Sequence, residues 1–443
     1  MASMRHELDL RPLVAVAVGL AAGISGHWLG LLILLAALAI AIRPGVRLAI
    51  LAAATAGLLL SPSPVRGIGD RTVLSGEGTV ASVPRLYPDT AAFVLETGSG
   101  RFLATAKGRP EICLGDRLRF EGAARPPSEP SRTLYANRGL HGRLKLSRWA
   151  TLARGPSLFA VADAWRRSFL NFAERTLPKE RAAVASALAF NLDTLLGEDQ
   201  TEAFRRGGTL HIVSVSGAHV VMLSGVLGWI LGKTPLPRGG QIAVLALLLA
   251  FYAVTAGLGP PIVRAALMGL AFGVPYLSRR EGDFPSGLAI AVLVVLLWQP
   301  RALREVGFQL SFVTVGAMGL FGGTSEIRQG FVASFASLPL VAYHFAAAPI
   351  LAVPANLLIA LGVTVTTVGG IGSHLLSFPW PGGGAFAMKT FIDPCVRLIE
   401  DISRWVGSPE WAVVRFPYIP DWAIVAVYAA LIALWRPRRR EVS

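Results

Sequence analysis

Long hydrophobic runs alternate with short polar breaks over most of the chain, and one longer polar segment interrupts them. Apolar runs of about 17–25 residues predict membrane-spanning helices. The pattern therefore predicts a polytopic α-helical membrane protein of about ten spans, with a small all-β domain inserted after the first spans. The expected spans lie near residues 12–26, 28–42, 47–60, 207–232, 240–257, 261–278, 286–299, 306–322, 331–348, 352–377 and 421–435.

The first sixty residues allow two interpretations. Soft breaks at His27-Trp28 and Pro44-Gly45 favour three short spans. One long tilted span followed by a shorter one is the alternative. With three spans, the segment after residue 61 emerges on the outer side of the membrane, and with two it does not.

Residues 62–155 have the composition of a soluble domain. Polar and apolar residues alternate in Arg117–Phe120 and again in Arg143–Leu146, as in half-buried strands. Gly98-Ser99-Gly100 predicts a tight hairpin. Five short strands with a long connection before the last one predict a small Greek-key barrel of the OB type. The expected strands are Thr72–Val83, Ala91–Thr97, Arg101–Ala106, Arg117–Gly122 and Gly142–Ser147.

The domain organisation follows from these changes of composition. An amphipathic helix is expected over 157–176, and a short charged helix over 199–206 leads into the central apolar run. The predicted parts are N-terminal spans in 1–61, the OB-like domain in 62–155, linking helices in 156–206, a transmembrane channel bundle in 207–436 and a basic tail in 437–443.

Polar residues cluster at the start of the apolar run 207–232. His211, Ser214, Ser216 and His219 all lie in its first half. Polar groups at membrane depth are costly, so they normally face a bundle interior or a wet cavity. One interpretation is a polar path lined by this helix. The other is structural, with the serines bonded to carbonyls of their own helix and the histidines at the interface.

Charge sets the expected topology. The chain has 443 residues, of which 53% are hydrophobic and 16% charged, and its mean hydropathy is +0.55, as in membrane proteins. The formal net charge of +15 suits cytoplasmic loops, anionic lipid or a polyanionic substrate. Arginines near the first spans and in the tail predict a cytoplasmic N-terminus, an external β domain and a cytoplasmic C-terminus. This count of crossings requires one segment that is re-entrant, interfacial or doubly spanning, and residues 352–377 and 395–416 are the two candidates for it.

Metal and hydrolase chemistry find little support in the sequence. Eight helical residues separate His211 from His219 by about 12 Å, too far for one zinc ion. Cys113 and Cys395 fit no metal spacing, so no metal or other cofactor is expected. Ser216 and His219 have the spacing of a serine-hydrolase dyad, an alternative that lacks a recognisable oxyanion hole. A transporter of an anionic small molecule is a second alternative, which leaves the β domain without a task.

The β domain carries candidate contacts to nucleic acid. Arg117, Arg119, Arg143 and Lys145 alternate with apolar residues and are expected on solvent-facing sides of their strands. Few aromatic residues remain for base stacking. The sequence therefore predicts that any binding of nucleic acid by this domain is weak and mainly charge-driven. The alternative is a barrel that serves only as a scaffold.

Four motifs in order are similar to those of the ComEC competence-channel family. They are Phe204–His211 continuing through Val215–Val220, Pro261–Ala265 with Met268, Gly307–Phe312 and Pro354–Leu357. The resemblance implies a channel of the cytoplasmic (inner) membrane that passes single-stranded DNA inward during natural transformation. It adds residues to the expected channel lining, which comprises His211, Ser214, Ser216, His219, Arg264, Gln309, Ser311 and Asn356.

The resemblance also implies partners. Single-stranded DNA and membrane lipid are expected, with a separate cytoplasmic motor, an external DNA receptor and a separate nuclease, and a homo-oligomer is compatible with the sequence. Many members carry a C-terminal metallo-β-lactamase-like domain. This sequence contains no His-x-His pair, so no nuclease or other enzyme activity is expected. Arg264 has an alternative role in snorkelling to the interface. Gln309 and Ser311 have an alternative role in forming hydrogen bonds between neighbouring helices.

Overall fold

The computed structural model describes residue 54 and most of residues 72–434. The gaps within 72–434 are 129–130, 133–134, 136–137, 214–216, 260–261, 264, 268, 271–283, 299, 322, 324 and 417–418. The predicted N-terminal spans, apart from residue 54, and the basic tail 437–443 lie outside the described residues.

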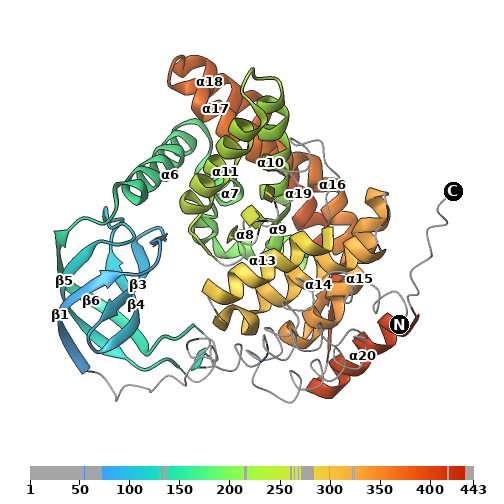
Figure 1. Cartoon of the computed structure of the whole chain (residues 1–443), viewed down its shortest axis with the longest axis horizontal. Coiled ribbons are helices and arrows are strands. Elements are labelled where there is room, and N and C mark those ends of the chain that lie inside the picture. The colour runs from blue at the N-terminus through green and yellow to red at the C-terminus, as the bar shows by residue number, and fades with distance from the viewer. Residues whose placement is uncertain are drawn as a thin grey trace. The chain divides into compact units, whose positions relative to one another are not determined.

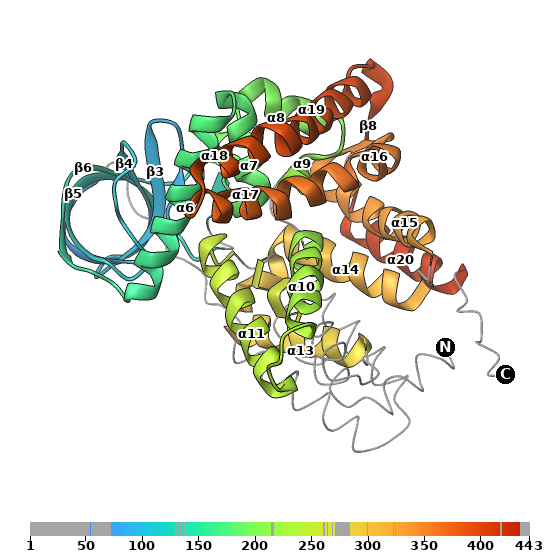
Figure 2. The same ribbon diagram turned by 90° about the horizontal axis from the view of Figure 1, so that it is seen from above.

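Six strands form the β domain, and five of them close a barrel (Figures 1 and 2). The closed order is β1-β5-β6-β4-β3, with β1 pairing back to β3, and β4 and β6 are parallel. Counting only those five strands, the first lies between the second and fourth, and the third pairs with the fifth. That is the OB topology, so the predicted barrel is confirmed. The strands are β1 (Thr72–Val80), β2 (Arg85–Leu86), β3 (Thr90–Thr97), β4 (Gly100–Lys107), β5 (Arg117–Arg125) and β6 (Gly142–Ala153).

Gly78 is the residue at which β1 closes the barrel. It pairs with Leu118 of β5 and also with Thr97 of β3. A Cβ atom at this position would lie 2.9 Å from the carbonyl oxygen of Glu96. Because only glycine lets the two backbones approach this closely, β1 can bridge both neighbours. The core that results contains the inward-facing Phe93, Phe102, Leu118, Leu144 and their neighbours.

The helices belong to two units, each described by itself. The first unit comprises 63–273 and 358–408, and it includes the barrel. Its helices are α6 (Ser157–Thr176), α7 (Lys179–Phe190), η1 (Asp193–Leu195), α8 (Glu198–Arg206), α9 (Leu210–Val213), α10 (Gly217–Gly232), α11 (Arg238–Thr255), the π-helical η3 (Val365–Gly369), α17 (Gly370–Ser377), α18 (Pro381–Ala387), the π-helical η4 (Met388–Ile392) and α19 (Asp393–Gly407).

The second unit comprises 1–62, 274–357 and 409–443. Helix α16 (Ala352–Thr364) passes from this unit into the first. The described elements here are α13 (Phe284–Trp298), η2 (Pro300–Arg304), α14 (Val306–Phe321), α15 (Glu326–Phe345), β7 (Ala347–Pro349), η5 (Glu410–Ala412), β8 (Val413–Arg415) and α20 (Asp421–Leu434).

The prediction of about ten membrane spans is wrong for the described part of the chain. Two helices there are long and apolar enough to cross a membrane, Arg238–Thr255 and the continuous Ala352–Ser377. Other apolar runs form shorter helices, such as Val306–Phe321 with 16 residues, below the range of about 17–25 residues that a span needs. Hydropathy measured the length of each apolar run, whereas turns and 3₁₀ segments decide the length of each helix.

The central run 207–232 begins with a close helix contact. A Cβ atom on Gly207 would lie 2.7 Å from the Ser403 carbonyl oxygen, and the hydroxyls of Thr209 and Ser403 are 2.9 Å apart. The glycine that ends α8 is therefore also the point at which α8 packs against α19. Helix α10 begins at Gly217, and residues 214–216 lie outside the described part.

Candidate nucleic-acid interface

The outer face of strands β5 and β6 collects basic side chains. The strict alternation of β5 leaves Arg117, Arg119 and Arg125 exposed while Leu118 and Phe120 enter the core. On β6, Arg143 and Lys145 are exposed in the same way. Strands β5 and β6 are antiparallel neighbours, with Arg125 opposite Arg143 and Ala123 opposite Lys145. All four predicted residues therefore lie on one solvent-facing surface of the barrel, which we call the β5–β6 face.

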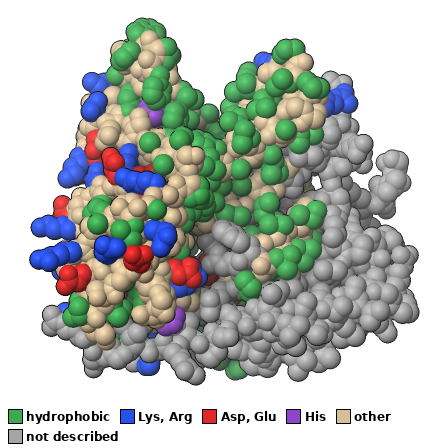
Figure 3. Space-filling view, turned by 60° about the vertical axis from the view of Figure 1, so that its left-hand side comes forward, with side chains coloured by type: hydrophobic (Ala, Val, Ile, Leu, Met, Phe, Trp, Pro, Cys, Tyr) green, Lys and Arg blue, Asp and Glu red, His purple; other side chains and the backbone are tan. Residues whose placement is uncertain are grey.

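Acidic residues compensate one half of the β5–β6 face. Glu77 of β1 accepts hydrogen bonds from Arg117 at 3.1 Å and from Arg119 at 3.4 Å. These pairs are largely exposed, so each is weak. Glu121 lies opposite Arg148 in the β5–β6 register. Figure 3 shows such a mixture, with Lys and Arg side chains gathered at the left of the view and acidic ones among them.

The other half of the β5–β6 face, around Arg125, Arg143 and Lys145, has less of its positive charge compensated. Arg143 donates from Nε to the Tyr135 hydroxyl at 2.9 Å, and its guanidinium lies 5.7 Å from the centre of that ring. Lys145 and Arg125 have no acidic partner among the described residues. A phosphate chain would therefore find its strongest attraction at Arg125, Arg143 and Lys145.

The face that OB barrels ordinarily use offers no stacking platform here. That face is formed by the second and third barrel strands, here β3 and β4. Phe93 and Phe102, the aromatic residues of these strands, are both buried in the core. The exposed aromatics Tyr87 and Trp149 lie outside β3 and β4, each 37% exposed. Binding through base stacking on this face is accordingly not expected.

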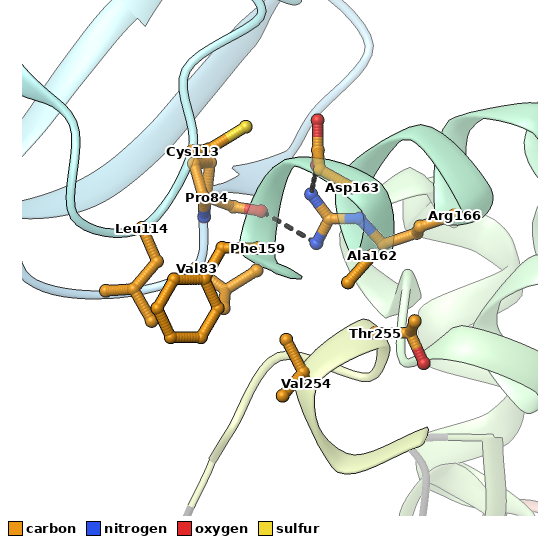
Figure 4. Close-up of a pocket in the computed structure, with 10 residues that line it drawn as sticks. All are labelled: Val83, Pro84, Cys113, Leu114, Phe159, Ala162, Asp163, Arg166, Val254 and Thr255. Carbon is orange, nitrogen blue, oxygen red and sulfur yellow. Dashed lines mark hydrogen bonds and ion pairs between the residues drawn. The ribbon is translucent and has the colours of Figure 1, made fainter. Parts of the chain in front are cut away.

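A buried ion pair fixes the barrel to α6 (Figure 4). Arg166 pairs with Asp163 and donates to the Pro84 carbonyl oxygen at 3.0 Å. Arg167 pairs with Asp163 at 2.5 Å and donates to the Pro110 carbonyl oxygen at 2.7 Å. Burial lowers the pKa of Arg166, and the charge of the Asp163 carboxylate and its hydrogen bond oppose this shift. The two arginines thus hold two barrel loops, and Val83, Cys113 and Phe159 complete the small pocket around them.

Only some predicted channel-lining residues lie in the described part of the first unit. His211 is exposed on α9, whereas His219 on α10 is buried. Ser214, Ser216 and Arg264 lie outside the described residues. The proposed dyad of Ser216 and His219 therefore has no geometry to test.

In the second unit, Gln309 joins two helices. Its Oε1 lies 2.7 Å from Nε2 of His344, and its Nε2 donates to the Leu303 carbonyl oxygen at 3.1 Å. Because the amide oxygen can only accept, Nε2 of His344 is the donor to Oε1. This contact links α14 to α15. Sequence reasoning missed His344, since its sequence neighbourhood carries no motif and only the helix pairing brings it to Gln309.

Asn356 and Ser311 complete the predicted set. Both are half-buried, on α16 and α14. The buried Oδ1 of Asn356 has no hydrogen-bond partner among the described residues. The described part of the chain contains no group of three or more His, Cys, Asp or Glu side chains that could hold a metal ion.

Comparison with known proteins decides the family. The family model described as competence protein matches residues 188–441, more than half of the chain. The chain belongs to the competence protein family. The resemblance inferred from the sequence motifs is thereby confirmed, and membership makes the chain a protein of the cell membrane.

Two curated relatives of this competence protein show how far the likeness extends. Competence protein ComA of Neisseria gonorrhoeae is 32% identical over 269 residues, which are 56% of this chain and 37% of ComA. ComE operon protein 3 of Bacillus subtilis is 28% identical over 204 residues, which are 44% of this chain and 26% of that protein. The chain thus matches well under half the length of either relative. No solved structure matches it.

Proposed function

We propose that this competence protein forms part of a membrane channel through which single-stranded DNA enters the cell during natural transformation. The competence-family match over 188–441 carries the proposal, because it covers most of the apolar helices. The OB barrel precedes that region and presents a net basic surface. Its contacts with phosphate would be independent of sequence, as uptake of any DNA requires.

The proposed path lies in the bundle of residues 207–436, with His211, His219, Gln309, Ser311 and Asn356 as its described polar candidates. Ser214, Ser216 and Arg264 complete the set by motif. A homo-oligomer would bring several copies of the two long apolar helices to one path. Transport through such a path requires a separate motor, an external DNA receptor and a nuclease that produces the single strand, and we assign no catalytic role to this chain.

Transformation frequency in a deletion strain tests the proposal. Complementation with the wild-type gene should restore both transformation and the appearance of labelled single-stranded DNA inside the cell. His211→Ala, at an exposed position beside the proposed path, should reduce both at unchanged membrane abundance. Glu202→Ala, an exposed position on the preceding helix α8, is the matched control and should leave both unchanged. Wild-type transformation by the deletion strain would overturn the proposal.

The proposed orientation places the barrel outside the cytoplasm and the C-terminus inside. Ser99 lies exposed in the tight turn between β3 and β4, so a cysteine there reports the side of the barrel. An impermeant maleimide should label Ser99→Cys in intact spheroplasts. Labelling that requires lysis would place the barrel in the cytoplasm.

A further inference from the structure

Residues 352–407 form a long antiparallel helical hairpin. The outgoing arm is the continuous helix of α16, η3 and α17, and the return arm consists of α18, η4 and α19. A Cβ atom on Gly362 would lie 3.4 Å from Ile399, one on Gly369 would lie 2.9 Å from Ile392, and one on Gly384 would lie 2.6 Å from Ser377. Each step forward along one arm is matched by an equal step backward along the other, because the residue numbers of every contacting pair have the same sum. The two arms therefore stay in register from the base to the tip. Figure 1 shows α17 and α18 side by side at the end of the hairpin.

Both ends of the hairpin lie on one side of any membrane it enters. Strand β7, just before the hairpin, pairs with β8, just after it. The Ile350 N–H also donates to the Ala412 carbonyl oxygen at 2.9 Å. Because these flanking segments are hydrogen-bonded to each other, the two ends of the hairpin lie at the same depth relative to a membrane.

The return arm cannot cross the hydrocarbon core. The outgoing arm has 26 residues without a charged side chain, long enough at about 1.5 Å per residue to span the roughly 30 Å core. On the return arm, however, Lys389, Arg397 and Asp401 are exposed. Lys389 lies nine residues after Trp380, or about 14 Å along a helix. Since charges are costly in lipid, the depth available to the hairpin is about half of the bilayer.

The tip is suited to lipid. Its turn, Phe378-Pro379-Trp380-Pro381, exposes Phe378 by 60% and Trp380 by 64%. Phe386 on α18 is 64% exposed and Leu375 on α17 is 52% exposed. The whole stretch 352–388 contains no Asp, Glu, Lys or Arg. Large exposed apolar and aromatic side chains without any charge are typical of a surface that contacts the membrane.

We propose that residues 352–407 form a re-entrant hairpin that enters the bilayer from one side, places its aromatic tip near the midplane and returns to the same side. The sequence left residues 352–377 and 395–416 open as the re-entrant segment. The pairing of the arms shows that residues 352–377 and most of 395–416 belong to one hairpin. The ion pair between Arg181 of α7 and Asp393, 2.5 Å long, then lies at the polar boundary beside the base of the tip.

Cysteine accessibility in the full chain tests the proposal independently of DNA transport. The background is Cys113→Ala with Cys395→Ala, which removes both native thiols. Cys113 interferes little in any case, because burial and the nearby Asp163 and Asp116 raise its pKa to about 11. Single cysteines replace Trp380 at the tip, Arg397 on the return arm and Glu410 just after the hairpin. Ser99→Cys on the barrel is the exposed control.

The expected result separates the tip from the base. An impermeant maleimide should label Arg397→Cys and Glu410→Cys from the same side of oriented membrane vesicles. It should label Trp380→Cys from neither side until detergent is added. An environment-sensitive fluorophore on that cysteine should be quenched most strongly by lipids brominated near the ends of their acyl chains.

Three outcomes would overturn the proposal. Labelling of Trp380→Cys from the side opposite Glu410→Cys would show that the hairpin crosses the bilayer. Labelling as fast as Ser99→Cys would place the tip in water. Protection from maleimide without quenching by brominated lipid would show that protein, such as a second copy of this chain, covers the tip.

Two glycine variants test whether the pairing of the arms holds the tip at this depth. Gly384→Leu places a side chain against Ser373 and Ser377, whereas a Cβ atom on Gly372 meets nothing within 4 Å. Gly384→Leu should therefore shift the fluorophore at residue 380 to a different quenching depth, and Gly372→Leu should leave the depth unchanged. Equal depths in both variants would show that the arms do not need to pair at the tip.

Discussion

Nε2 of Gln200 lies 2.6 Å from Oε1 of Glu400, and both side chains are buried. Gln200 also donates to the Glu180 carbonyl oxygen at 3.2 Å, so it links α7, α8 and α19. Burial raises the pKa of Glu400 above its ordinary value of 4.5, and the hydrogen bond from Gln200 opposes this shift. The charged groups that act on Glu400 are Arg404 and Arg181, which lower its pKa, and Glu180, which raises it.

Glu400→Gln is expected to stabilise the protein at neutral pH. Because the pKa is higher in the folded than in the unfolded chain, ionised Glu400 destabilises the fold at every pH above its folded pKa. This effect fades as the pH falls through that pKa and is absent below about 4.5. The melting temperature of Glu400→Gln in detergent should therefore exceed that of the wild type at pH 7 by a margin that shrinks at acidic pH. A margin independent of pH would show that charge is not its cause.

Asp163→Ala is expected to destabilise the junction between the barrel and α6 strongly. It leaves the buried Arg166 without its carboxylate partner, and removal of one member of a buried pair costs about 3–5 kcal/mol. The matched control is Glu174→Ala, which breaks the more exposed pair with Arg109 and should cost less than about 1 kcal/mol. Denaturant unfolding followed by circular dichroism compares the two, and equal losses would contradict the prediction.

Binding of oligonucleotides to the purified full chain should depend on Lys145 more than on Arg119. Lys145→Ala removes a charge without an acidic partner among the described residues, whereas Arg119 already faces Glu77. Removal of one cation that binds a phosphate should lower the slope of log affinity against log salt by about 0.7 for single strands. Glu77→Gln should instead strengthen binding at low salt, because it releases Arg117 and Arg119. Tight binding that persists at physiological salt would reveal a stacking surface, contrary to this prediction.

Gln309→Ala and His344→Ala should lower stability by amounts that do not add. Each removes one partner of the contact between α14 and α15, so the second substitution has less left to disrupt. A double-mutant cycle on melting in detergent should give a coupling of about 0.5–3 kcal/mol. Additive effects would show that the contact contributes nothing, and would favour a role for Gln309 toward a ligand.

Local patterns predicted the barrel well and the bundle poorly. Alternation in Arg117–Phe120 and Arg143–Leu146 identified two of its strands, because every second side chain of a barrel strand must enter the core. The prediction ended the last strand at Ser147, whereas β6 continues to Ala153 and includes the exposed Trp149. The pairing of β5 with β6 shifts register between Glu121 and Gly122, and this interrupts the alternation of β6 after Leu146. No local sequence pattern predicts this shift.

The sequence by itself determined the family, through four ordered motifs, and the OB barrel, through alternation and turn residues. The tertiary structure decided which basic residues of the β5–β6 face are compensated, because Glu77 comes from another strand. It also brought His344 to Gln309 across two helices. It also paired the helix of residues 352–377, whose hydropathy alone describes a span, with the charged arm that ends in α19. Hydropathy is a property of one segment, whereas the depth of a hairpin is limited by its more polar arm, and only the fold shows which arms are paired.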